Sequence, residues 1–120
     1  MDRNNTASYV LRTILFRSGA LQYASSLAFE GPRGTNRLFV VDPWSNQIMV
    51  YDAASPVTSF GSHGRLDGQF RRVMDIAIDH EHDRIFLADC DNHRVQVWSL
   101  SSLEFVSSIG RGGSGELEFR

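Results

Sequence analysis

Two stretches of the sequence, 49 residues apart, are nearly the same. Residues 60–70 are Phe-Gly-Ser-His-Gly-Arg-Leu-Asp-Gly-Gln-Phe, and residues 109–119 are Ile-Gly-Arg-Gly-Gly-Ser-Gly-Glu-Leu-Glu-Phe. Each stretch begins with an apolar residue and Gly, continues with more glycines and an acid or amide, and ends on Phe. Self-similarity at a period of about 20–50 residues is typical of repeat architectures. We therefore expect a chain built from about two copies of one structural unit.

The similarity continues through the segments between the glycine-rich stretches. The aligned segments are 25–30 with 74–79, 38–42 with 85–89, and 48–51 with 95–98. The spacing is 49 residues for the first pair and 47 for the other two, so the loop after Glu30 is two residues longer than the loop after Asp79. Surface loops tolerate such insertions. A weaker copy of the glycine-rich stretch lies at 19–21, where Gly-Ala-Leu matches the Gly-Gln-Phe of 68–70.

Short apolar runs within each unit predict β-strands. The runs are rich in Val, Ile, Leu and Phe and are bounded by Gly, Asn, Asp or Pro, and none has the length and spacing of an amphipathic helix. The expected strands are 9–16, 25–30, 37–42, 47–52, 56–61, 74–79, 84–89, 93–99 and 103–110. Four strands in a unit of about 40–50 residues is the blade of a β-propeller. The expected fold class is all-β: two four-stranded antiparallel blades plus one extra strand, forming part of a propeller.

This pattern divides the chain into four segments. Residues 9–16 are expected to be the outer strand of a preceding blade, 19–61 a first and degenerate blade, 62–110 a second blade, and 111–120 the beginning of a further blade. A single blade cannot bury both of its faces, so most of its stability comes from its neighbours. We therefore expect a segment of a longer propeller, whose open blade faces are covered by further blades or by self-association.

The second unit contains the longest motif of the chain. It runs from Gly-Arg-Leu-Asp-Gly-Gln-Phe at 64–70 through Ile-Ala-Ile-Asp at 76–79 to Ile-Phe-Leu-Ala-Asp-Cys-Asp-Asn-His-Arg-Val-Gln-Val-Trp at 85–98. This motif closely resembles the NHL repeat, in which a glycine-rich start ends in Gln-Phe, an apolar strand follows, a second strand closes on Asp, and Asn-His-Arg leads the next strand. The match covers nearly all of 60–99, whereas the first unit has Ser-Asn-Gln at 45–47 in place of Asn-His-Arg.

The resemblance implies a propeller blade, and a fold of this kind does not determine one function. NHL propellers serve as protein-binding domains, as RNA-binding domains and, in some cases, as peptide-amidating lyases with a metal at the channel. Such metal sites draw His and Asp from several blades, and two blades do not supply them. The sequence also lacks a nucleophile elbow, a phosphate loop before a helix, and paired cysteines. We expect a non-enzymatic module without a cofactor, and a lyase-like enzyme is the third alternative.

The composition is typical of a globular chain, with 42% apolar and 22% charged residues. The sequence contains no apolar run near the 18 residues of a membrane-spanning helix, and its beginning lacks the layout of a signal peptide. Cys90 is the single cysteine, so no internal disulfide is expected. These features favour a cytoplasmic location.

The candidate binding surface follows from propeller topology. The loop between blades and the loop between the second and third strands of a blade open on the same side, which we call the loop face. Its expected residues are His63, Arg65, Arg71, Arg72, Asn92 and Arg111, with Trp44 from the first unit. Guanidinium groups beside an aromatic ring can stack on or clamp a base. However, residues 1–60 carry five Arg against four acids and residues 61–120 carry seven against ten, so neither half is basic enough for a dominant electrostatic contribution to nucleic-acid binding. A protein partner is therefore expected, and single-stranded RNA is the alternative.

Two further polar clusters have structural interpretations. In the turn at 89–94, Asp89 and Asn92 are expected to bond the local backbone, and Arg94 to pair with an aspartate. The His-Glu-His-Asp sequence at 80–83 places two imidazoles two residues apart, which could ligate zinc. This segment lies at the tip between two strands and supplies at most part of a coordination shell, so no metal site is expected.

Overall fold

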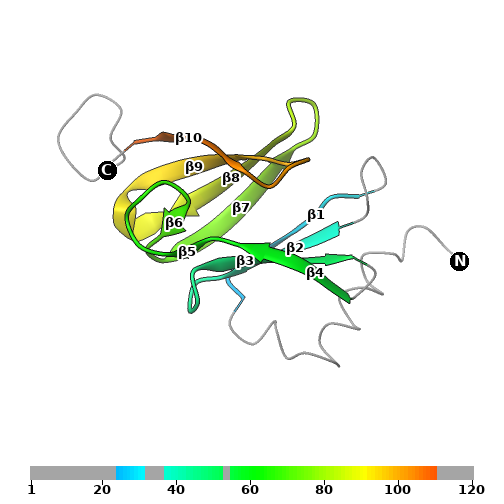
Figure 1. Ribbon diagram of the computed structural model, residues 1–120, viewed down its shortest axis with the longest axis horizontal. Coiled ribbons are helices and arrows are strands. Elements are labelled where there is room, and N and C mark those ends of the chain that lie inside the picture. Colours follow the sequence, from blue (N-terminus) through cyan, green and yellow to red (C-terminus); the bar gives the residue numbers. More distant parts are fainter. Residues whose placement is uncertain (1–23, 32–36, 53–54, 111–120) are drawn as a thin grey trace, which may run out of the picture.

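The computed structural model describes residues 24–31, 37–52 and 55–110. Within them the chain forms two four-stranded antiparallel sheets, one above the other in Figure 1. The first sheet, blade 1, contains β1 (Ser26–Phe29), β2 (Arg37–Asp42), β3 (Gln47–Asp52) and β4 (Ser55–Phe60) in that order. The second sheet, blade 2, contains β7 (Val73–Asp79), β8 (Arg84–Asp89), β9 (Arg94–Ser99) and β10 (Phe105–Ile109). The all-β prediction of two four-stranded blades is confirmed.

The eight strands coincide with eight of the predicted runs, with ends that differ by at most two residues. The ninth prediction, 9–16, lies outside the described residues, as does the segment 32–36. None of the described residues forms a helix that is long and apolar enough to cross a membrane. The one described helical segment is a single 3-10 turn, η3 (Cys90–Asn92), between β8 and β9.

The linker between the blades contains a structure that the sequence analysis did not predict. β5 (Ser62–His63) and β6 (Gln69–Phe70) pair in parallel within it. The Gly64 N–H donates to the Phe70 carbonyl at 3.0 Å, and the Leu66 N–H donates to Gln69 Oε1 at 3.1 Å. The glycine-rich linker therefore folds back on itself, and strands of two residues are too short to produce a hydrophobic pattern.

The two blades pack face to face around one hydrophobic core. Strand β8 illustrates which side chains enter this core. Ile85, Leu87 and Asp89 are buried, and they alternate with half-buried residues that point away from blade 1. At the outer side of the core, the ring of Trp98 lies 4.5 Å from that of Phe60 between centroids. The buried members of the core are Phe39, Val41, Ile48, Val50, Phe70, Val73, Ile76, Ile85, Leu87, Trp98 and Leu100. A smaller cluster of Leu38, Val40 and Tyr51 occupies the other face of blade 1.

Polar contacts connect the blades at both sides of this core. The guanidinium of Arg37 pairs with Glu30, with Nε 2.9 Å from Oε1, and its Nη2 also donates to the Leu100 carbonyl of blade 2 at 3.0 Å. The hydrogen bond to Glu30 raises the pKa of Arg37 further, although burial opposes the shift. At the inner strands, the Ser26 hydroxyl donates to Asp75 Oδ1 at 2.7 Å. Directional contacts thus fix the orientation of faces that apolar packing alone leaves free to slide.

Gly61 is required at the joint between the blades, because its φ is +95° and a Cβ built there would lie 2.8 Å from the ring of Phe70. Gly31 is a matched control, since its φ is +84° and none of the described residues lies within 4 Å of a built Cβ. Gly31→Ala should cost about 1–2 kcal/mol from backbone strain alone. Gly61→Ala should cost about 1–3 kcal/mol more because of overpacking. Urea unfolding followed by circular dichroism measures both, and equal losses would contradict the assigned contact.

Asp83 stabilises the end of blade 2 that lies opposite the linker. Its Oδ2 accepts from the Ser101 hydroxyl at 2.8 Å, its Oδ1 accepts from the Ser101 N–H at 2.9 Å, and the hydrogen bond from the Ser101 side chain lowers the pKa of Asp83. A lowered folded-state pKa stabilises the fold above the unfolded-state pKa, and this stabilisation is lost as the pH falls through the folded-state value.

The stability difference between the natural chain and Asp83→Asn should therefore be largest near neutral pH. It should shrink as the pH falls below about 4, where the carboxyl group becomes protonated in the unfolded chain. Thermal unfolding of both proteins between neutral pH and pH 3 checks this expectation. A difference that stays constant with pH would show that the charge of Asp83 does not stabilise the turn.

Candidate functional site

Three loops meet at one end of the two blades, at the left-hand side of Figure 1. They are the β2–β3 turn, the linker 61–72 and the β8–β9 turn. The N–H of Arg72 donates to Asn46 Oδ1 at 2.7 Å, which joins the linker to the β2–β3 turn. Asn92 Nδ2 donates to the Gly64 carbonyl at 2.9 Å, which joins the linker to the β8–β9 turn. The loop face is therefore one connected surface that draws on both blades.

The buried carboxylate of Asp89 fixes the linker against blade 2. Its side chain is fully buried and 2.8 Å from Nε of Arg94, whose own side chain is only 10% exposed. The donors to Asp89 are the Arg71 N–H at 2.8 Å, Asn92 Nδ2 at 2.9 Å, Arg94 Nε at 2.8 Å and Gln96 Nε2 at 3.3 Å. Because four donors satisfy the carboxylate, its burial is tolerated. The structure thus gives Asp89, Asn92 and Arg94 contacts within the fold.

Arg94 extends this network into the glycine-rich part of the linker. Its Nη2 donates to the carbonyls of Gln69 at 2.7 Å and Leu66 at 2.9 Å. Gln96 Nε2 donates to the same Gln69 carbonyl. A planar guanidinium group can serve several acceptors in fixed directions. The side chains of Arg94 and Gln96 therefore hold the backbone of the loop that carries Arg65 and Leu66.

Asn46 is a residue of the loop face that the sequence analysis missed. Its Oδ1 accepts from the backbone N–H groups of Arg72 and Val73, so its Nδ2 must face His63 Nδ1, 3.2 Å away. Nδ2 can only donate, and His63 Nδ1 must therefore accept. The repeat could have pointed to Asn46, because this residue aligns with His93 at a spacing of 47 residues. The structure agrees with the alignment, since φ is positive at both residues, +57° at Asn46 and +55° at His93.

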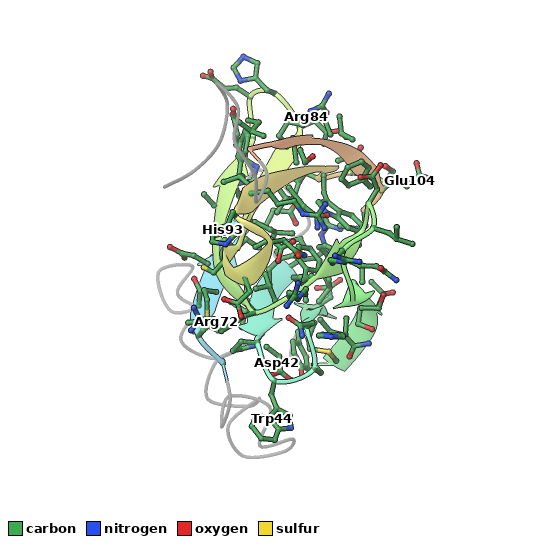
Figure 2. All side chains as sticks on the ribbon, turned by 90° about the vertical axis from the view of Figure 1, so that its left-hand side faces the viewer. Asp42, Trp44, Arg72, Arg84, His93 and Glu104 are labelled. Carbon is green, nitrogen blue, oxygen red and sulfur yellow. The ribbon has the colours of Figure 1, made fainter. Side chains whose placement is uncertain are left out.

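The remaining predicted residues are exposed at this end. Trp44 is 81% exposed on a turn in which its N–H donates to Asp42 Oδ1 at 2.9 Å, and Leu66, which was not predicted, is 71% exposed. Figure 2 labels Trp44, Arg72 and His93 among the side chains seen from this end. Arg111 lies outside the described residues.

The charges of the loop face are mixed. Arg72 is paired with Asp91 at 3.1 Å, and both side chains are about half exposed. In the described part of the chain, the guanidinium groups of Arg65 and Arg71 form no hydrogen bond or ion pair. The exposed Asp67 lies on the same loop. The surface therefore combines two unpaired cations, one paired cation and two large apolar side chains.

The His-Glu-His-Asp segment lies at the opposite end of blade 2 and is not part of the loop face. His82 Nδ1 is 2.8 Å from Asp79 Oδ2, and this hydrogen bond lowers the pKa of Asp79. Across the three described ranges, no three His, Cys, Asp or Glu residues are grouped so that they could hold a metal ion. Cys90 is an exposed free thiol in η3.

The two carboxylates of the β8–β9 turn provide a matched test of this network. Asp89→Asn should destabilise the chain by about 3–5 kcal/mol, because it removes the charge that pairs with the buried Arg94. Asp91→Asn, which removes the exposed partner of Arg72, should cost about 0–1 kcal/mol. Denaturant unfolding of the two variants measures the difference, and losses of similar size would disprove the assigned role of Asp89.

Comparison with known proteins supports the assignment of blade 2. Residues 70–98 match the family of the NHL repeat. Among solved structures, 32 chains match significantly. One is the crystal structure of a Bacteroides fragilis protein described as exported, with 18% sequence identity and a TM-score of 0.58; the match covers 66% of this chain and 23% of that chain. No curated protein matches significantly.

These matches agree with the geometry of the sheets. At 18% identity, the structural likeness shows the fold alone, and this chain spans less than a quarter of the length of the Bacteroides protein. The family match runs from Phe70, in the linker, to Trp98, in the third strand of blade 2. It confirms the resemblance drawn from the motif at 64–98. The chain therefore carries an NHL repeat, from which most of blade 2 is built.

Proposed function

We propose that the chain is a non-enzymatic module that binds a protein partner through the loop face. The observation that carries the proposal is the exposure of Leu66 and Trp44, at 71% and 81%, on the same surface as the unpaired Arg65 and Arg71. Trp and Arg dominate the residues at which protein interfaces concentrate their binding energy. A large apolar side chain next to a cation, as Leu66 is next to Arg65, suits a partner with an apolar residue beside an acidic one.

The anchoring of the loops supports the same proposal. Leu66 and Gln69 accept hydrogen bonds from the buried Arg94, and the Arg71 N–H is held by Asp89. A backbone that is already ordered loses less conformational entropy on binding than a free loop does.

Single-stranded RNA is the second candidate partner. The exposed Trp44 favours it, as do Arg71 and Arg72 elsewhere on the loop face, because aromatic rings and guanidinium groups stack on bases. The ion pair of Arg72 with Asp91 and the exposed Asp67 reduce the positive charge of the same surface. Since phosphate neutralisation supplies most non-specific affinity, this balance favours a protein partner.

The cytoplasmic location stays a prediction. The likeness to a Bacteroides fragilis protein described as exported does not support it. Neither location changes the residues of the proposed binding surface, since those residues follow from the geometry of the loops.

The test variant carries Leu66→Ser, Arg65→Glu and Arg71→Glu. It should bind the partner at least about 30-fold more weakly, because hot-spot residues contribute about 2 kcal/mol or more. The measurement is co-purification of bound proteins from an extract of the source organism, quantified by mass spectrometry. Glu104→Lys is the control, because Glu104 is exposed in the turn between β9 and β10, outside the loop face, and the change should leave recovery unchanged. Equal recovery with both variants would rule out the loop face as the binding surface.

Titration with a fluorescent single-stranded oligouridine at low salt separates the second candidate from the first. Binding that weakens with salt and disappears when Arg71 and Arg72 are both changed to Ala would favour RNA. Absence of binding at low salt would exclude RNA as the partner of this surface.

A further inference from the structure

Strand β10 is the outer edge of blade 2, and none of the described strands pairs with its free side. It is the orange and red strand of Figure 1, and β9 is its one neighbour in the described sheet. An edge strand presents a row of unpaired N–H and C=O groups, which can pair with another extended chain. The inner edges of the blades differ, because they contact each other: the Ser25 hydroxyl donates to the Met74 carbonyl at 2.9 Å.

The strand register identifies a backbone position of β10 that points away from the sheet. The Ser99 N–H donates to the Glu104 carbonyl at 2.8 Å, so the backbone groups of Ser99 face the β10 side. Because such groups alternate in direction along an antiparallel strand, those of Val97 face the same side, and those of its partner Ser107 face β9. The next residue, Ser108, therefore directs its N–H and C=O groups away from β9.

The edge of blade 2 lacks a protection that the edge of blade 1 has. Natural edge strands are protected by Pro, by charged residues or by bulges. Both outer strands contain a bulge, but β4 also contains Pro56, which lies opposite Tyr51 and has no backbone N–H. The residue of β10 at the corresponding position, 49 residues later, is Phe105, opposite Trp98. β10 has the sequence Phe-Val-Ser-Ser-Ile, with neither Pro nor a charged residue.

The side chains along this edge suit an extended partner. Ser107 and Ser108 are exposed, and Val106 and Ile109 are 43% and 44% exposed. Val and Ile are enriched in strands, where they pack against side chains of the neighbouring strand. The strand carries no charge that would repel or attract a charged segment, so its complement is an uncharged one.

We propose that the free edge of β10 binds an extended, uncharged segment of a partner protein by β-strand addition. The backbone of that segment exchanges hydrogen bonds with the N–H and C=O groups of Ser108, and its β-branched side chains pack beside Val106 and Ile109. Extended backbone is the occupant that matches the spacing of these groups along a strand. The site is separate from the loop face, so the proposal does not depend on the proposed function.

The test titrates the full chain into a fluorescein-labelled synthetic peptide, Lys-Thr-Val-Thr-Val-Thr-Lys, and follows fluorescence anisotropy. The peptide should bind with a Kd of about 1 mM or tighter, as expected for a short added strand. The control peptide is N-methylated at each residue between the two Lys and has no backbone N–H there. It should bind at least about 10-fold more weakly, because its hydrogen bonds to the edge are lost. Absence of binding, or equal binding of the two peptides, would overturn the proposal.

A matched pair of variants locates the site on β10. Ser108→Pro removes the N–H that points away from β9 and leaves the pairing with β9 in place, since Pro is tolerated at such edge positions. It should weaken binding of the peptide at least about 10-fold. Ser59→Pro is the control, because Ser59 has the corresponding position in β4, 49 residues earlier, and its replacement should leave binding unchanged. Equal effects of the two changes would contradict the assignment to β10.

Amide hydrogen exchange of the natural chain gives a readout that needs no variant. Saturating peptide should slow exchange of the Ser108 N–H at least about 10-fold and leave that of Leu66, on the loop face, unchanged. Slower exchange at Leu66 and not at Ser108 would overturn the proposal. Sedimentation of the natural chain tests the competing occupant: a dimer that is lost in Ser108→Pro would assign the edge to a second copy and contradict the proposal.

Discussion

The constraint on which this structure depends is that each four-stranded sheet carries apolar side chains on both of its faces. One sheet cannot remove both faces from water, so its stability requires a neighbour. Between the two blades this requirement is met by a core in which Phe39, Phe70 and Leu87 are fully buried. The spacing of 47 to 49 residues in the sequence is the length of chain needed to complete one such sheet and return to the start of the next.

Polar contacts then determine how the packed sheets are oriented. Arg37 joins the blades on one side of the core, and Asp89, Asn46 and Arg94 fix the linker on the loop face. These groups are buried or nearly so, and an unpaired group there would be costly. As a result, the backbone of the linker that joins the blades is held by side chains of both blades at several points.

The strands were predictable because neighbouring residues of a strand point to opposite faces of the sheet, which gives an alternating pattern in the sequence. In β8, for example, Ile85, Leu87 and Asp89 alternate with less buried residues. The loop face was predictable in outline because propeller topology brings its loops together. Its most informative contacts could not be predicted. Asn46 Oδ1 accepts from the backbone N–H groups of Arg72 and Val73, which lie 26 and 27 positions away in the sequence. The inward orientation of Asn92 also could not be foreseen, because an Asn in a turn is equally suited to solvent.

The repeat of the amino-acid sequence is sufficient to establish strand number, strand order and the position of the joints, since these depend on local periodicity and on turn residues such as Gly61. The three-dimensional packing alone assigns partners to the polar groups and separates covered faces from open ones. Phe39 and Phe86 occupy equivalent positions in the repeat, yet one is fully buried and the other only half-buried. The physical reason is that burial depends on what lies across the face, which is a property of the folded arrangement and not of the segment.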